Sequence, residues 1–131
     1  MTTTTVTVAG PQGIAGVTAY DLGFSFSGPF SLESLRFALP RACTFTAASC
    51  VAVASVAATA ETVFTIRVGT TTAGTVTFAA GAATGTVAFD FEDVTLTLTL
   101  AAGDLLELRA PASADATLDG VAITLAGQVA P

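Results

Sequence analysis

The chain has few side chains that could carry chemistry, and their densest group is the acidic segment FDFEDV. In an extended segment, alternation places Asp90 and Glu92 on one face, with Asp93 beside them. Several carboxylate oxygens are the ligands that Ca²⁺ prefers. The segment also has the composition of a solvated turn between two strands, which is the interpretation we favour. Asp115 and Asp119 in ADATLDG predict turn capping, because Asp side chains hydrogen-bond nearby backbone amides.

The residue types that catalysis uses most often are scarce. The chain has no His, so neither a Ser–His nucleophile nor a His-ligated metal site can form. Glycan hydrolysis needs a pair of carboxylates in a cleft, and the chain has no Trp and a single tyrosine, Tyr20, to stack on a sugar. We therefore expect a non-enzymatic protein without a metal or any other cofactor.

Four arginines are the only cationic side chains. Arg36 and Arg41 bracket the segment FALP, and we predict that they pair with acids across a subunit contact, because guanidinium groups form planar bidentate hydrogen bonds. Ordinary surface charge is the alternative. Arg67 and Arg109 occupy polar positions of their strands, where we expect them to keep sheet edges soluble. The net charge of −6 argues against nucleic acid and membrane as partners, since both favour basic patches.

The two cysteines, Cys43 and Cys50, lie seven residues apart. A disulfide across a tight hairpin is one possibility. Free cysteine is among the most buried residue types, and we favour two free thiols here.

The elements that position these residues are short runs in which polar and apolar residues alternate. Between residues 62 and 125 they are TVFTIRV, GTVTFAA, GTVAFDF, VTLTLTL, DLLELRA and GVAITLA. Period-two alternation turns one face of a strand toward a core and the other toward water or a partner. YDLGFSF, LESLRFALP, ACTFTAA and SCVAVASVAA extend the pattern toward the N-terminus. The sequence predicts an all-β protein, an antiparallel, jelly-roll-like β-sandwich of about eight to ten strands.

The connections and the core follow from the same pattern. Residues 69–74, 81–85 and 101–104 have hairpin chemistry, with glycine for positive φ and Asp or Thr for capping. The predicted core consists of the large apolar residues at inward positions: Phe24, Phe26, Phe37, Phe64, Ile66, Phe78, Phe89, Leu106, Leu108 and Ile123.

The surface is predicted to meet other protein. Hydrophobic residues make up 52% of the chain and charged residues 11%, whereas about a quarter is usual for charged residues. A monomer with so few charges would leave much of its surface apolar, and such surfaces mark interaction sites.

The first 16 residues are predicted to form an arm and a linker, followed by one β-sandwich domain over residues 17–131. Residues 2–8 are β-branched throughout and favour extended chain, so we expect an arm that pairs with a neighbour's sheet edge; a disordered tail is the alternative. MTTTTVTVAG lacks the features of a secretory signal. The predicted partner-binding residues are Thr2, Thr3, Thr4, Thr5, Val6, Thr7, Val8, Arg36 and Arg41.

Several segments resemble a known family. AAGDLLELRAP and ADATLDGVAITLAG are the most specific, and YDLGFSFSG, LRFALPRACTF and TVFTIRVGTTTAGTVTFAAGAATGTVAFDF also look similar. They resemble a β-sandwich domain of tailed-phage virion proteins that follows a collagen-like stalk in tail-fibre, head-fibre and spike chains. GPQGIAG, with glycine at every third position, looks like a shortened stalk. The resemblance covers about residues 10–127; it implies a homotrimer and carries no catalytic motif.

The short region before the domain fits a small protein lying flat on a particle better than a long fibre. We expect a capsid decoration (cement) protein on the virion surface, made in the host cytoplasm, that contacts itself and the major capsid protein or another virion protein. The alternative is a short head- or tail-fibre or spike module that binds a host-surface glycan. A free-standing carbohydrate-binding or adhesion domain is a third possibility.

Overall fold

The computed structural model describes residues 18–26, 34–111 and 117–129. The predictions for residues 2–8, for the linker over 10–16 and for Asp115 lie outside these ranges.

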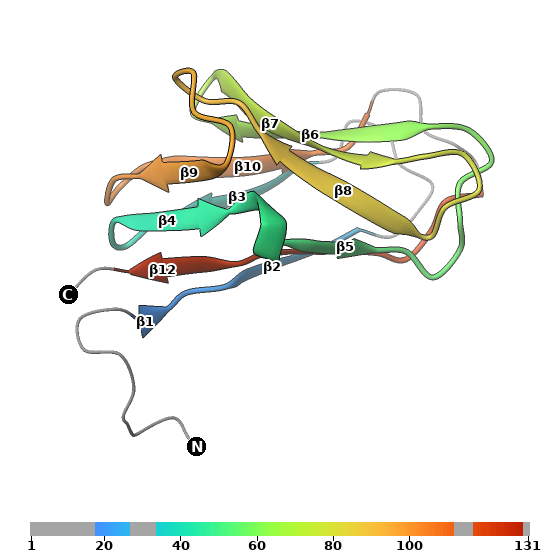
Figure 1. Ribbon diagram of the computed structural model, residues 1–131, viewed down its shortest axis with the longest axis horizontal. Helices are drawn as coiled ribbons and strands as arrows, with labels where there is room; N and C mark the ends of the chain where they lie inside the picture. Colours follow the sequence, from blue (N-terminus) through green and yellow to red (C-terminus); the bar gives the residue numbers. More distant parts are fainter. Residues whose placement is uncertain (1–17, 27–33, 112–116, 130–131) are drawn as a thin grey trace, which may run out of the picture.

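The described residues form twelve antiparallel β-strands and one turn of 3-10 helix (Figure 1). They contain no α-helix, and none of them belongs to a helix long and apolar enough to cross a membrane. The elements are β1 (Thr18–Ala19), β2 (Leu22–Phe26), β3 (Ser34–Ala38), β4 (Cys43–Thr46), η1 (Ala47–Ser49), β5 (Val51–Val53), β6 (Thr62–Val68), β7 (Thr71–Phe78), β8 (Thr84–Phe89), β9 (Thr97–Leu100), β10 (Leu105–Arg109), β11 (Val121–Leu125) and β12 (Gly127–Val129).

The strands build two sheets. One has four strands in the order β1-β12-β4-β9, and the other has eight in the order β2-β11-β5-β8-β7-β6-β10-β3. The larger sheet is nearly closed on itself, and the smaller one lies at the left of Figure 1. The predicted all-β, sandwich-like fold is confirmed.

Two long ribbons pass through both sheets. In the first, residues 18–26 run antiparallel to residues 121–129 in one register, from Thr18 opposite Val129 to Phe26 opposite Val121. In the second, residues 34–46 pair with residues 97–109, again without a change of register between the two sheets. Both ribbons are interrupted where they leave one sheet for the other. These interruptions raise the number of strand segments above the eight to ten predicted.

Two of the three predicted hairpins are confirmed, but their connections are shorter than predicted, because residues 71–74 belong to β7 and residues 84–85 to β8. β6 and β7 pair across a turn that begins with Gly69 (φ 60°), and β7 and β8 pair across a connection that contains Gly81 (φ 78°). Glycine adopts such left-handed backbone conformations without the steric cost that a Cβ atom brings.

The third predicted hairpin, over residues 101–104, is wrong. A turn is present, with Gly103 at φ 89° and a 2.9 Å hydrogen bond from the Ala101 amide to Asp104 Oδ2. β9 and β10 do not pair with each other, because β9 pairs with β4 and β10 with β3. Turn residues serve equally well for a hairpin and for a bend in a long strand, so the sequence could not separate the two.

The inward faces form one core. Nine of the ten predicted core residues are buried, and Phe64 packs against Phe26 and Phe78 at ring-centroid distances of 5.1 and 6.1 Å. Phe37 is the exception: it is half-buried and packs against the core, because β3 is an edge strand of the larger sheet.

Candidate partner-binding surface

Three arginines and one glutamate lie on neighbouring strands, on the outer face of the larger sheet. Glu107 on β10 lies opposite Arg36 on β3 and opposite Arg67 on β6. Its Oε1 is 3.6 Å from Arg67 Nη1, and its Oε2 is 3.6 Å from Arg109 Nη2. Arg67 also donates a 3.0 Å hydrogen bond to the Thr70 carbonyl oxygen. We call Arg36, Arg67 and Arg109 the arginine patch.

The arginine patch carries more positive charge than Glu107 neutralises. The patch holds three arginines beside one glutamate, which leaves two positive charges in a chain whose net charge is −6. Both ion-pair distances exceed the roughly 2.7–2.9 Å of a charge-assisted hydrogen bond. Glu107 is buried, whereas the Arg109 side chain is 41% exposed and Arg36 is exposed without an ion pair to any described residue. The patch therefore has donors left for an acidic partner.

The sequence identified only part of this arrangement. Arg36 belongs to the arginine patch, whereas Arg41 lies exposed in the connection between β3 and β4 and forms no ion pair with a described residue. The expectation that Arg67 and Arg109 protect sheet edges is wrong, because β6 and β10 are interior strands. Opposite charges at alternate strand positions, as in Glu107 and Arg109, were the available signal, but they do not reveal which strands are neighbours.

The acidic segment FDFEDV forms a tight turn, as favoured from the sequence. Phe91 and Val94 exchange backbone hydrogen bonds of 3.2 and 3.0 Å. The two residues between them, Glu92 and Asp93, both have left-handed backbones, with φ of 54° and 64°. Two-residue turns with positive φ at both positions usually contain Asn-Gly or Asp-Gly, so Glu-Asp is an unusual pair here. Across the described ranges, no group of three or more His, Cys, Asp or Glu side chains is placed to hold a metal ion.

The predicted turn capping by Asp119 is confirmed. The Oδ1 atom of Asp119 accepts a 2.7 Å hydrogen bond from the Gly120 amide. The Asp119 backbone also bridges to Val56. The Asp119 carboxylate thus caps the turn that leads into β11.

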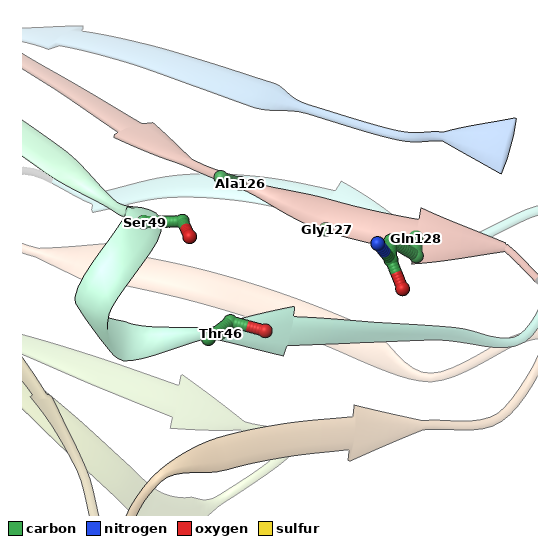
Figure 2. A pocket seen from close by; sticks show the side chains of 5 residues that line it. All are labelled: Thr46, Ser49, Ala126, Gly127 and Gln128. Atoms are coloured by element: carbon green, nitrogen blue, oxygen red, sulfur yellow. The ribbon is translucent and has the colours of Figure 1, made fainter.

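A small pocket lies between η1, β4 and β12 (Figure 2). It forms because η1 inserts three residues between β4 and β5, while Ala126 alone separates the partner strands β11 and β12. Its volume of about 100 Å³ is well below the roughly 300–1,000 Å³ of typical ligand sites. Its lining has hydroxyl and amide groups but no charged side chain: Thr46, Ser49, Ala126, Gly127 and Gln128.

Both cysteines are free thiols, as favoured from the sequence. Burial raises the pKa of the Cys43 thiol, and the negative charge of Asp104 raises it further. Burial also raises the pKa of Cys50, against the opposing hydrogen bond from the Ala126 amide to its Sγ. Protonated thiols are poor nucleophiles, so neither cysteine is activated for covalent chemistry.

The outer face of β2, β11, β5 and β8 lacks charge. These four strands are neighbours in the larger sheet, and the side chains that alternate with their core residues are all exposed. Val51 and Val53 are 55% and 43% exposed. We call this set the uncharged face; it consists of Gly23, Ser25, Ala122, Thr124, Val51, Val53, Thr84, Thr86 and Ala88.

Comparisons with known proteins add no relative to this geometry. No protein-family model matches the chain. No curated protein and no solved structure matches it either. The fold is therefore described from its own strand pairing, and the resemblance to the phage virion domain stays a prediction.

Proposed function

We propose that this protein is a non-enzymatic virion structural protein: a capsid decoration protein that acts as a homotrimer and clamps major capsid subunits. The observation that carries the proposal is the uncharged face, which spans four neighbouring strands without one charged side chain. The cores of protein–protein interfaces are depleted of charged residues.

The physical reason is the cost of removing water. Burying an ionised side chain in an interface is expensive unless it finds a partner. On the uncharged face, the exposed side chains are Ser, Ala, Thr and Val, beside one glycine. Their dehydration requires no compensating ion pair, and their small size allows a flat partner surface to approach closely.

The predicted N-terminal arm gives this docking a second anchor. Residues 2–8 would add a strand to a sheet edge of a capsid subunit, because backbone donors and acceptors supply affinity in strand addition. The linker over residues 10–16 would connect this anchor to β1, which starts at Thr18.

The test introduces charge into the uncharged face without touching the core. Val53→Glu places a carboxylate at an exposed position of β5, so we expect the fold to survive and binding to undecorated capsids to be lost in co-sedimentation. Leu96→Glu is the matched control, because Leu96 is 78% exposed and lies between β8 and β9. Equal binding by the two variants would contradict docking through this face.

Copy number separates the decoration proposal from the fibre alternative. A decoration protein is present in hundreds of copies per particle, and a fibre or spike module in a handful. Quantitative mass spectrometry of purified particles measures this ratio. The pocket of about 100 Å³ gives the glycan-binding alternative no support.

A further inference from the structure

We propose that the arginine patch of one copy binds the Glu92–Asp93 turn of a neighbouring copy, so that the chains associate head to tail. The inference rests on the self-association included in the proposed function and names the surfaces that would form it. It does not depend on where in a virion the protein lies.

The arginine patch has the charge and geometry to bind carboxylates. Arg36, Glu107 and Arg67 form a row across three paired strands, with Arg109 two residues along β10 on the same face. Like charges on neighbouring strands repel each other, and Glu107 balances only one of the three. Arg67 Nη2 already donates to the Thr70 carbonyl oxygen, whereas the Arg109 side chain is 41% exposed and lies 3.6 Å from Glu107. The planar guanidinium of Arg109 can therefore bind a further carboxylate in a bidentate manner.

The second surface is the acidic turn at Glu92 and Asp93. The hydrogen bonds between Phe91 and Val94 close the turn, and the left-handed backbones of Glu92 and Asp93 hold both residues at its apex. Both carboxylates are exposed, and neither forms an ion pair with a described residue of its own chain. Figure 1 shows the connection between β8 and β9 at the upper left, beyond the end of β8.

The charges of the two surfaces match. The arginine patch with Glu107 carries two excess positive charges, and the turn supplies two negative ones. A chain with a net charge of −6 repels its own copies and other polyanions at long range, and a local contact of opposite sign would offset this repulsion when two copies associate. A second copy always carries the complementary turn at the same concentration as the patch. We therefore assign the patch to a second copy rather than to an unrelated acidic partner.

The symmetry follows from the use of two different surfaces. Such a contact is heterologous, and heterologous contacts close into rings or continue into filaments. With the proposed homotrimer, three copies close the ring, and each turn occupies the patch of the next chain.

The experiment uses two neutralised variants of the full chain, examined by light scattering and sedimentation equilibrium. Arg36→Gln with Arg109→Gln removes the two most exposed patch charges and leaves Arg67 on Glu107. Glu92→Gln with Asp93→Asn removes the turn charges, and Asn tolerates the left-handed backbone. We expect the wild type to associate, each variant alone to be monomeric at micromolar concentration, and their mixture to form one-to-one pairs, because each variant retains the half that the other lacks.

Three controls test whether a loss of association has another cause, such as a change of net charge or a loss of the fold. Glu61→Gln neutralises an exposed charge outside both surfaces and should leave association unchanged. Raising the salt from about 0.1 to about 1 M shortens the Debye length from roughly 10 to roughly 3 Å and should weaken the wild-type contact at least about tenfold. Far-UV circular dichroism checks that both double variants are folded.

The outcomes separate the contact from the wider proposal. Wild-type oligomers that both variants also form would overturn the head-to-tail contact while leaving the homotrimer intact. A mixture that stays monomeric would overturn it as well. A monomeric wild type would overturn both the contact and the homotrimer, whereas attachment to capsids is measured separately by co-sedimentation.

Discussion

Glu107 lies directly opposite Arg36 across the β10–β3 ladder, yet its two oxygens form ion pairs with Arg67 and Arg109. One buried carboxylate is thus shared among more cations than it can neutralise. Removing one partner from a buried charge network costs more than the pair itself contributes, because the remaining charges lose their compensation.

The first prediction concerns this carboxylate. Glu107→Gln keeps the side-chain shape but leaves three arginines side by side, so we expect the free energy of unfolding to fall by about 1–3 kcal/mol. Urea denaturation measures the change. Glu61→Gln is the control, because Glu61 is exposed and forms no ion pair with a described residue, and its effect should stay within about 0.5 kcal/mol. Similar values for the two variants would show that Glu107 does not hold the arginine patch together.

The second prediction concerns the thiols. The folded protein raises the pKa of Cys43 and Cys50 above the usual 9.0, so the folded state favours the protonated form. The resulting stability is fully present below pH 9.0 and is lost as the pH rises through the higher folded-state values. We expect slow reaction with a thiol reagent at pH 8 and a lower denaturation midpoint above pH 9. Rapid labelling of both thiols in the native protein would contradict the burial.

The third prediction concerns the centre of the core. Phe64 is fully buried against Phe26 and Phe78, so Phe64→Ala should lower the free energy of unfolding by about 3–5 kcal/mol. Leu96→Ala removes a side chain that is 78% exposed and should change little. Thermal denaturation of both variants gives the comparison, and a mild effect at Phe64 would mean that the core is packed differently.

The fourth prediction concerns the close approach of two strands at Gly127. A Cβ atom there would lie 2.7 Å from Phe45 Cδ1 and 2.8 Å from the Tyr20 carbonyl oxygen. Gly127→Ala should therefore destabilise the protein by about 1–3 kcal/mol through overpacking. At Gly23 no atom lies within 4 Å of an added Cβ, so Gly23→Ala should be tolerated. Chemical denaturation distinguishes the two, and equal stability would argue against the tight β12–β4 contact.

The fifth prediction concerns the N-terminal arm. Deleting residues 2–9 removes chain that precedes the first described strand, Thr18–Ala19. We expect the truncated protein to keep its β-rich circular dichroism spectrum and to lose attachment to undecorated capsids in co-sedimentation. Unchanged attachment would place the docking entirely on the β-sandwich.

The sequence by itself determined the class of the fold and most of its core. Alternation with period two can bury only one face of a strand, and this pattern identified inward residues such as Phe24, Phe64 and Ile123, all of which are buried. Phe37 is less buried than expected because edge and interior strands share the same pattern. The sequence also located the acidic turn at Glu92 and Asp93, because turn composition is a local property.

Only the tertiary structure decided which strands are neighbours and in which register. The arginine patch joins β3, β6 and β10, whose residues lie far apart along the chain, and a shift of one residue on β10 would turn Glu107 to the opposite face. The bend at Gly103 looked like a hairpin because both use the same turn residues. Pairing between distant strands depends on how the whole core packs, and no local pattern contains that information.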